Sequence, residues 1–299
     1  MILLGVKIRN FTDKAGYSDD FKKICDFLIQ INKDKVITPN CLWARWVWQF
    51  GQHTETQSHF GVAEDNELVV GIALYDHGLG EAYFCADPNY PHIKPLLIDF
   101  AVKNLSLNGE IRITLPDGDL NYQQAAIQRG FIPTAEKFST ARIDIKENAY
   151  YLPKDYLIMG CGDSNFDVDK YYDAIWKGFD NERERNESEM ESVKNREGFD
   201  KPYLDLNIRI MVVAPNGDYA AHCGMWCIPG SGYAYVEPVF TLPQYRKKGL
   251  GKAAVLEGVT RCGKLGAKQA YVLSSQQFYY NIGFYPFLNE TWWVQKHIR

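Results

Sequence analysis

A basic segment that contains two glycines carries the clearest chemical signal in the sequence. It reads Thr241-Leu242-Pro243-Gln244-Tyr245-Arg246-Lys247-Lys248-Gly249-Leu250-Gly251-Lys252 and lies between an expected strand and an expected helix. Glycines let the backbone approach a ligand closely, and the first turn of a helix presents unpaired N–H groups at the positive end of its dipole. One charge at an exposed helix start is worth only about 0.3 to 1 kcal/mol, so several N–H groups must act together with Arg246, Lys247, Lys248 and Lys252. The segment, residues 241–252, therefore predicts a polyphosphate site.

Two known nucleotide-binding motifs can be compared with this segment. A P-loop requires G-x-x-x-x-G-K-[ST], but Arg246 stands in place of the first glycine and Ala253 in place of the hydroxyl residue. A dinucleotide fold requires G-x-G-x-x-G/A, which Gly249-x-Gly251-x-x-Ala254 satisfies. In that fold the glycines follow the strand directly, whereas about ten residues intervene here. The P-loop is excluded, while a dinucleotide-binding oxidoreductase and a solvated loop that only caps the helix stay open.

The segment is also part of a longer pattern. Arg246-x-x-Gly249-x-Gly251 is followed about 30 residues later by Phe278-Tyr279-Tyr280-Asn281-Ile282-Gly283-Phe284. Together these motifs resemble the GCN5-related N-acetyltransferase (GNAT) family, and residues 237–246 are especially similar to its two-domain members, such as mycothiol synthases. The resemblance covers about residues 208–284. It implies an α/β (α+β) fold of the acyl-CoA N-acyltransferase type, a mixed and mostly antiparallel sheet flanked by helices, in which two strands splay apart and acetyl-CoA enters the gap.

The resemblance also implies roles for individual residues. A carboxylate on the strand before the motif often accepts the amine proton in this family, and Glu237 stands there; the alternative is an ion pair at the sheet edge. A base is useful because deprotonating an amine of pKa near 10.4 costs roughly 4.6 kcal/mol at pH 7. Tyr279 matches the family tyrosine that protonates the departing thiolate, with core packing as the alternative. Backbone groups of Val239, Phe240 and Thr241 would pair with the pantetheine arm, and Leu250 lies in the phosphate-binding turn.

The predicted activity follows from these roles. We expect an N-acetyltransferase in which the primary amine of a small molecule or peptide attacks acetyl-CoA directly, without a metal. A non-catalytic acyl-CoA-binding or sensory module would keep Arg246 to Gly251 but hold Glu237 away from the thioester. The dinucleotide-binding oxidoreductase is a third reading.

The chain also contains the same order of elements twice. Pro88 and Gly130 are 42 positions apart, and Pro243 and Gly283 are 40 apart. Because this period is a whole domain, the pattern predicts a tandem duplication, with a degenerate domain at 1–148 and a catalytic, acetyl-CoA-binding domain at 149–299. When the prolines are aligned, Lys94 stands opposite Gly249. The first domain therefore lacks the CoA motif, and we expect it to complete the substrate cleft or to stabilise its partner.

Composition narrows the class of protein. The 299 residues are 46% hydrophobic and 23% charged, as in soluble globular proteins. Thirty-three basic against 37 acidic residues leave a net charge of -4, which argues against nucleic acid and acidic membranes as partners. No apolar run reaches the 18 or so residues of a membrane span, so a cytoplasmic protein is expected. Its oligomeric state is expected to be a monomer or a homodimer. The seven cysteines have no metal-ligand spacing and are expected to be buried, reduced thiols.

Overall fold

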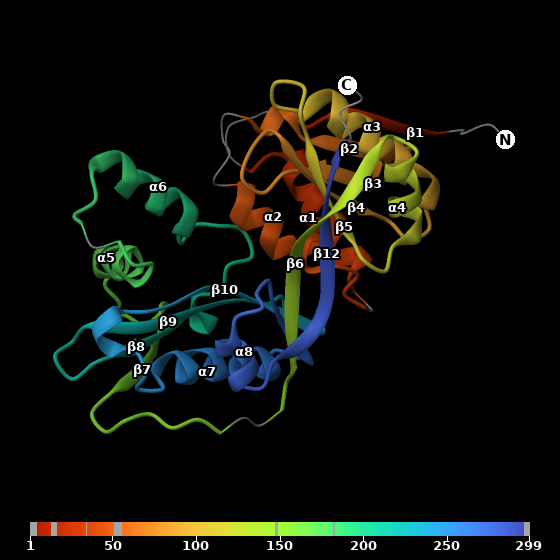
Figure 1. Ribbon diagram of the computed structural model, residues 1–299. Helices are drawn as coiled ribbons and strands as arrows, with labels where there is room; N and C mark the ends of the chain where they lie inside the picture. Colours follow the sequence, from red (N-terminus) through yellow and green to blue (C-terminus); the bar gives the residue numbers. More distant parts are fainter. Residues whose placement is uncertain are drawn as a thin grey trace. The chain divides into compact units, whose positions relative to one another are not determined.

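The computed structural model describes residues 5–12, 17–33, 35–50, 56–146, 149–181 and 183–295, without the side chains of Gln49 and Arg196. The chain divides into two compact units, residues 1–140 with 286–299 (unit 1) and residues 141–285 (unit 2). It leaves unit 1 within strand β6 (Phe131–Asp144) and returns to it at the start of β12 (Tyr285–Gln295), the two long strands in Figure 1. This division differs from the single boundary expected at 148/149, because the chain crosses between the units twice.

Unit 1 is a mixed sheet with helices. Its strand order is β1 (Val6–Asn10), β2 (Gly61–Asp65), β3 (Leu68–Leu74), β4 (Glu81–Ala86), β5 (Arg112–Pro116), β12 and β6. Its helices are α1 (Asp19–Ile31), α2 (Trp43–Phe50), α3 (Lys94–Asn104) and α4 (Leu120–Ile127). Strand β1 with β2, β2 with β3, β3 with β4 and β5 with β12 pair antiparallel, whereas β4 and β5 pair in parallel over two residues only.

Unit 2 repeats this plan. Its strand order is β6 (residues 141–144), β11 (Gln269–Val272), β10 (Tyr233–Thr241), β9 (Tyr219–Trp226), β8 (Ile210–Val213) and β7 (Leu157–Gly160). Its helices are α5 (Val168–Gly178), α6 (Glu187–Glu197), α7 (Leu250–Lys264) and α8 (Gln277–Asn281). Again one neighbouring pair is parallel and short, because β10 and β11 pair only over Tyr233–Tyr235 with Gln269–Tyr271. Each unit thus has the mostly antiparallel, helix-flanked sheet that the sequence predicts. Among the described residues, no helix is both long and apolar enough to cross a bilayer.

The helices of unit 2 pack on opposite faces of its sheet. Gly258 of α7 lies against β9, where an added Cβ would stand 2.6 Å from Met225 Cγ. On the other face, a Cβ at Gly178, the last residue of α5, would stand 2.5 Å from the ring of Phe240. Both glycines permit a close approach that a larger residue would prevent. These contacts hold α5 and α7 at the end of β10 where the predicted site lies.

A carboxyl group from the last strand is buried in unit 1. Glu290 of β12 is 2% exposed and accepts a hydrogen bond from Asn40 Nδ2 at 2.7 Å. Burial raises the pKa of Glu290 to about 7. This strand therefore brings an acid into unit 1 that is neutral at mildly acidic pH.

Glu290→Gln should remove a pH dependence of stability. The native carboxyl keeps a proton that the unfolded chain releases between pH 4.5 and about 7, so the free energy of unfolding falls as pH rises through this interval. At pH 7 this group lowers the free energy of unfolding by about 3 kcal/mol, and the loss disappears below pH 4.5. Urea unfolding at pH 5 and pH 7 measures it; equal slopes with pH in the wild-type and variant proteins would contradict the assignment.

Two cysteines depart from the expected reduced state. Cys41 and Cys85 form a disulfide within unit 1, with their Cα atoms 5.5 Å apart. The turn before α2 and strand β4 bring these residues together across 44 positions, a separation that carries no spacing signal in the sequence. The other five cysteines are buried and free, as expected.

Candidate active site

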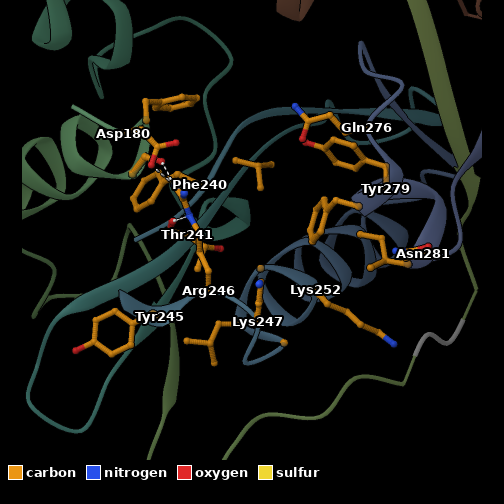
Figure 2. A pocket seen from close by; sticks show the side chains of 18 residues that line it. Asp180, Phe240, Thr241, Tyr245, Arg246, Lys247, Lys252, Gln276, Tyr279 and Asn281 are labelled. Carbon is orange, nitrogen blue, oxygen red and sulfur yellow. Dashed lines mark hydrogen bonds and ion pairs between the residues drawn. The ribbon is translucent and has the colours of Figure 1, made fainter. Parts of the chain in front are cut away.

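A pocket of about 870 Å³ lies in unit 2 where β10 ends and α7 begins (Figure 2). Ten of the twelve predicted site residues line it: Val239, Phe240, Thr241, Arg246, Lys247, Gly249, Leu250, Gly251, Lys252 and Tyr279. The two that do not are Lys248 and Glu237. The rest of the wall comes from Tyr245, from the end of α5 and from α8 with its flanking residues: Gly178, Phe179, Asp180, Tyr245, Gln276, Phe278, Asn281 and Ile282. Of these, only residues 178–180 and Gln276 lie outside the two motif segments of the sequence.

The start of α7 has the features of an anion-binding turn. Its N-cap residue, Gly249, has a φ of 81° and supplies no side chain to bond the first N–H groups, whereas α1, α4, α5 and α6 each begin with a side-chain cap. The N–H of Ala253 bonds the Gly249 carbonyl at 3.0 Å and starts the helical pattern. A Cβ at Gly251 would stand 2.9 Å from Thr241 Oγ1, so glycine keeps this turn open. The turn can therefore present main-chain N–H groups to a ligand in the pocket.

The four basic residues of the segment take different positions. The Arg246 guanidinium bonds the carbonyls of Thr241 and Gly178 and pairs with Asp180. The Lys248 ammonium lies 5.1 Å from the centre of the Tyr245 ring. Lys247 and Lys252 are exposed residues that line the pocket. Of the four predicted basic residues, Lys247 and Lys252 are therefore the ones whose charge is available to a ligand in the pocket.

Glu237 lies in an irregular stretch of β10. The ladder with β9 passes from Val236–Met225 to Val239–Cys223, so Glu237 and Pro238 together lie opposite Gly224. A Cβ at Gly224 would stand 2.4 Å from the Glu237 carbonyl oxygen. Such a bulge redirects a side chain next to the point where pairing ends. Here it lies two residues beyond Tyr235, the last β10 residue that pairs with β11.

Buried groups hold Glu237 in this position. Trp226 Nε1 donates to the Glu237 carbonyl at 2.9 Å, and the Tyr235 hydroxyl donates to Glu237 Oε2 at 3.4 Å. Trp226 and Tyr235 are 3% and 0% exposed, while Glu237 itself is only partly buried. A carboxylate on a rigid support that still reaches solvent can exchange a proton with an incoming group.

Tyr279 enters the pocket from α8. It is 7% exposed, and its ring packs at 5.1 Å from Phe278 and 5.4 Å from Phe284. Burial raises the pKa of its hydroxyl, with smaller contributions from Cys223 and Glu237. No described residue is hydrogen-bonded to this hydroxyl. Tyr279 is therefore a protonated donor at neutral pH.

Tyr279→Phe is expected to lower kcat about tenfold and to leave the Kd for acetyl-CoA unchanged. The effect is modest because a thiolate, with a thiol pKa near 8.5, already leaves readily. Initial rates of thiol release at saturating acetyl-CoA measure kcat, and calorimetry measures Kd. A normal kcat would assign Tyr279 to packing alone.

The helix start in unit 1 that aligns with Gly249 in the sequence has a lysine there, and its side chain is bonded within unit 1. Lys94, which opens α3, bonds Asp119 Oδ2 at 2.6 Å and lies 4.7 Å from the centre of the Tyr122 ring. Tyr122 is buried and stacks on Phe84 of β4 at 5.5 Å. The helix start in unit 1 thus carries an ion pair and an aromatic stack in place of glycines.

Comparisons with known proteins bear on the fold and on the domain that contains this pocket. A model of the acetyltransferase (GNAT) family matches residues 169–285. Among solved structures, a GNAT acetyltransferase from Colwellia psychrerythraea is similar over 97% of this chain and 100% of that chain, at 13% identity and a TM-score of 0.59. A tandem GNAT protein from the clavulanic acid biosynthesis pathway is similar over 97% and 98%, at 12% identity and a TM-score of 0.59.

A GNAT protein from Sphaerobacter thermophilus is also similar, over 97% of this chain and 95% of that chain, at 11% identity and a TM-score of 0.57. A sequence comparison with curated proteins gave no match. At these identities the structural likeness establishes the fold, and the family match identifies the domain. This domain is of the class of acetyl-CoA-dependent acyltransferases. Residues 169–285 match the GNAT family, and the solved structures show that the chain has the fold of such proteins.

Proposed function

We propose that unit 2 transfers the acetyl group of acetyl-CoA to a primary amine of a small molecule or peptide by direct attack. One observation carries the proposal: a helix start without a side-chain cap opens into a pocket beside the end of the β10–β11 ladder. Glu237 and Tyr279 lie near that point, close enough for the charge of Glu237 to affect the Tyr279 hydroxyl. A polyphosphate site, a base and an acid are the groups that this reaction uses.

The donor would be held mainly by the backbone. Main-chain N–H groups at the start of α7 bind the diphosphate of coenzyme A, and Lys247 and Lys252 add positive charge. The β10–β11 ladder ends at Tyr235, whereas β10 continues to Thr241. The backbone of Val239, Phe240 and Thr241 can pair with the pantetheine arm there, which leads the thioester toward Glu237.

The chemical step then uses two side chains. The neutral amine nitrogen forms a bond to the thioester carbon, and its proton passes to Glu237 directly or through water. The tetrahedral intermediate collapses, the carbon–sulfur bond breaks, and the coenzyme A thiolate takes a proton from Tyr279. Water then returns a proton to Tyr279, and Glu237 releases its proton to solvent. A backbone N–H of β10 can stabilise the oxyanion during this step. The products are the acetylated amine and free coenzyme A.

Thiol release from acetyl-CoA tests the activity. The protein is incubated with amino-sugar, polyamine, amino-acid and peptide amines in turn, with water alone as the blank. At least one amine should raise the rate of thiol release above the blank, with one acetyl group found on the amine per thiol released. Binding of acetyl-CoA without release for any amine would favour the non-catalytic module, and binding of NADH in its place would favour the oxidoreductase.

We also propose that unit 1 binds no coenzyme A. The start of α3 supports this, since it carries Lys94, paired with Asp119, at the position that aligns with Gly249 in the sequence. Calorimetric titration of the full chain should give one acetyl-CoA site, and Gly251→Val should weaken binding at that one site. A second site of similar affinity would contradict the proposal.

A further inference from the structure

The Arg246 side chain joins two walls of the pocket. Its Nε donates to the Thr241 carbonyl at 3.0 Å, and its Nη2 donates to the Gly178 carbonyl at 3.2 Å. The same Nη2 pairs with Asp180 Oδ1 at 2.6 Å, and these contacts are drawn in Figure 2. Thr241 ends β10, while Gly178 and Asp180 lie at and just after the end of α5. One guanidinium therefore connects the strand wall to the α5 wall.

The α5 wall depends on such a connection. Residues 178–180 all line the pocket, and Asp180 has a φ of 62° as the chain turns away from the helix. Phe179 is 49% exposed, so its side chain is not anchored in the core. Gly178 rests against Phe240, which gives this wall one fixed point. The bonds from Arg246 supply the others.

The orientation of Arg246 also bears on how the donor is bound. Arginine presents its N–H groups in a planar fork, and here both Nε and Nη2 are directed to protein acceptors. We propose that Arg246 and Asp180 form a clasp that positions the wall at residues 178–180, and that Arg246 supports acetyl-CoA binding through this wall and not as a phosphate ligand. The inference rests on the proposed donor site.

The two possible roles of Arg246 predict opposite changes in acetyl-CoA affinity when Asp180 is replaced. If Arg246 were a phosphate ligand, Asp180 would compete with the phosphate, and Asp180→Asn would strengthen binding by freeing the guanidinium. If the two residues form a clasp, Asp180→Asn loosens the wall and weakens binding. Removing one negative charge near a polyanion also favours binding in general, so a single variant cannot separate these effects. A double-mutant cycle can, because the general charge effect is present in both backgrounds and cancels.

The cycle uses the full chain as wild type, Asp180→Asn, Arg246→Gln and the double variant, titrated with acetyl-CoA by calorimetry at fixed ionic strength. Asp180→Asn multiplies Kd by one factor in the wild-type background and by another in the Arg246→Gln background. The first factor divided by the second should give a ratio of about three, the size expected for an exposed ion pair. A ratio near one, or a ratio below one, would overturn the clasp. Arg246→Lys replaces Arg246→Gln in the cycle if the latter does not fold.

Two further measurements separate positioning from loss of structure. The thermal midpoint of unliganded Asp180→Asn should stay within about 2 °C of the wild type, as for most exposed substitutions, while its Kd changes. Asp173→Asn is the matched control, since Asp173 lies on α5, pairs with Arg185 and is similarly exposed, but does not line the pocket. It should leave Kd unchanged. A wild-type protein that gives no heat with acetyl-CoA would overturn the proposed function itself, whereas a wrong coupling sign would overturn only the clasp.

Discussion

Replacing Glu237 by glutamine is expected to lower kcat at pH 7 by about 10²- to 10⁴-fold, the usual contribution of a positioned base. Glutamine keeps the shape of the side chain but cannot accept the amine proton. Glu237 does not line the donor pocket, so the Kd for acetyl-CoA should not change. Thiol release at saturating acetyl-CoA and amine measures kcat, and calorimetry measures Kd. The loss should shrink as the pH approaches 10, where the amine is deprotonated without help.

The matched control for this variant is Glu191→Gln, on the exposed face of α6. It removes the same charge from unit 2 and should leave kcat unchanged. Equal turnover of Glu237→Gln and wild type at pH 7 would assign Glu237 to the structure of the bulge alone. A parallel loss in both kcat and acetyl-CoA binding would mean that the bulge, and not the proton, had been disturbed.

Replacing Gly251 by valine should weaken acetyl-CoA binding about 100-fold or more, which corresponds to about 2.7 kcal/mol. The first added atom would stand 2.9 Å from Thr241 Oγ1 and 3.5 Å from the ring of Phe278. The branched side chain would therefore project into the turn where N–H groups meet the ligand. Calorimetry with acetyl-CoA measures the change in Kd.

Gly118→Val is the control for this substitution, because a Cβ at Gly118 meets no atom within 4 Å and its φ is not in the left-handed region. It should leave Kd unchanged. If Gly251→Val binds acetyl-CoA with wild-type affinity, the diphosphate does not lie at the start of α7. A thermal unfolding curve for each variant confirms that a lost signal reflects binding and not unfolding.

Local signals in the sequence predicted much of unit 2. The helix expected after the basic segment is found at Leu250–Lys264, because a glycine start and an apolar face are both encoded in the local sequence. Asn216-Gly217 is a typical hairpin turn, and it lies between β8 and β9 with Gly217 at a φ of 88°, as such a turn requires. These elements depend on residues close in sequence, so the pattern alone was sufficient.

The path of the chain between the units was not predictable in this way. Strand β12 lies between β5 and β6 in unit 1, although it follows unit 2 in the sequence. Its position depends on long-range contacts such as that between Glu290 and Asn40, which are 250 residues apart. No periodicity within a strand encodes which distant strand it will join. The sequence analysis placed a single boundary at 148/149, whereas the chain passes between the units after residues 140 and 285.

In the candidate site, too, the sequence predicted what lies within one loop and not what depends on distant contacts. Motif spacing identified the turn at Gly249 and Gly251 because those residues act together within one loop. It did not identify the wall at residues 178–180, which reaches the pocket only through the packing of α5. Nor did side-chain type reveal that Arg246 is bonded to Asp180 or that Lys248 lies over Tyr245. These directions are set by neighbours distant in the sequence.

A crystal structure of the protein with acetyl-CoA tests the central claim most directly. The account predicts that the diphosphate of coenzyme A accepts hydrogen bonds from the main-chain N–H groups of the turn around Gly249 to Lys252, with the thioester beside Glu237. A diphosphate bound at any other part of the chain would contradict it.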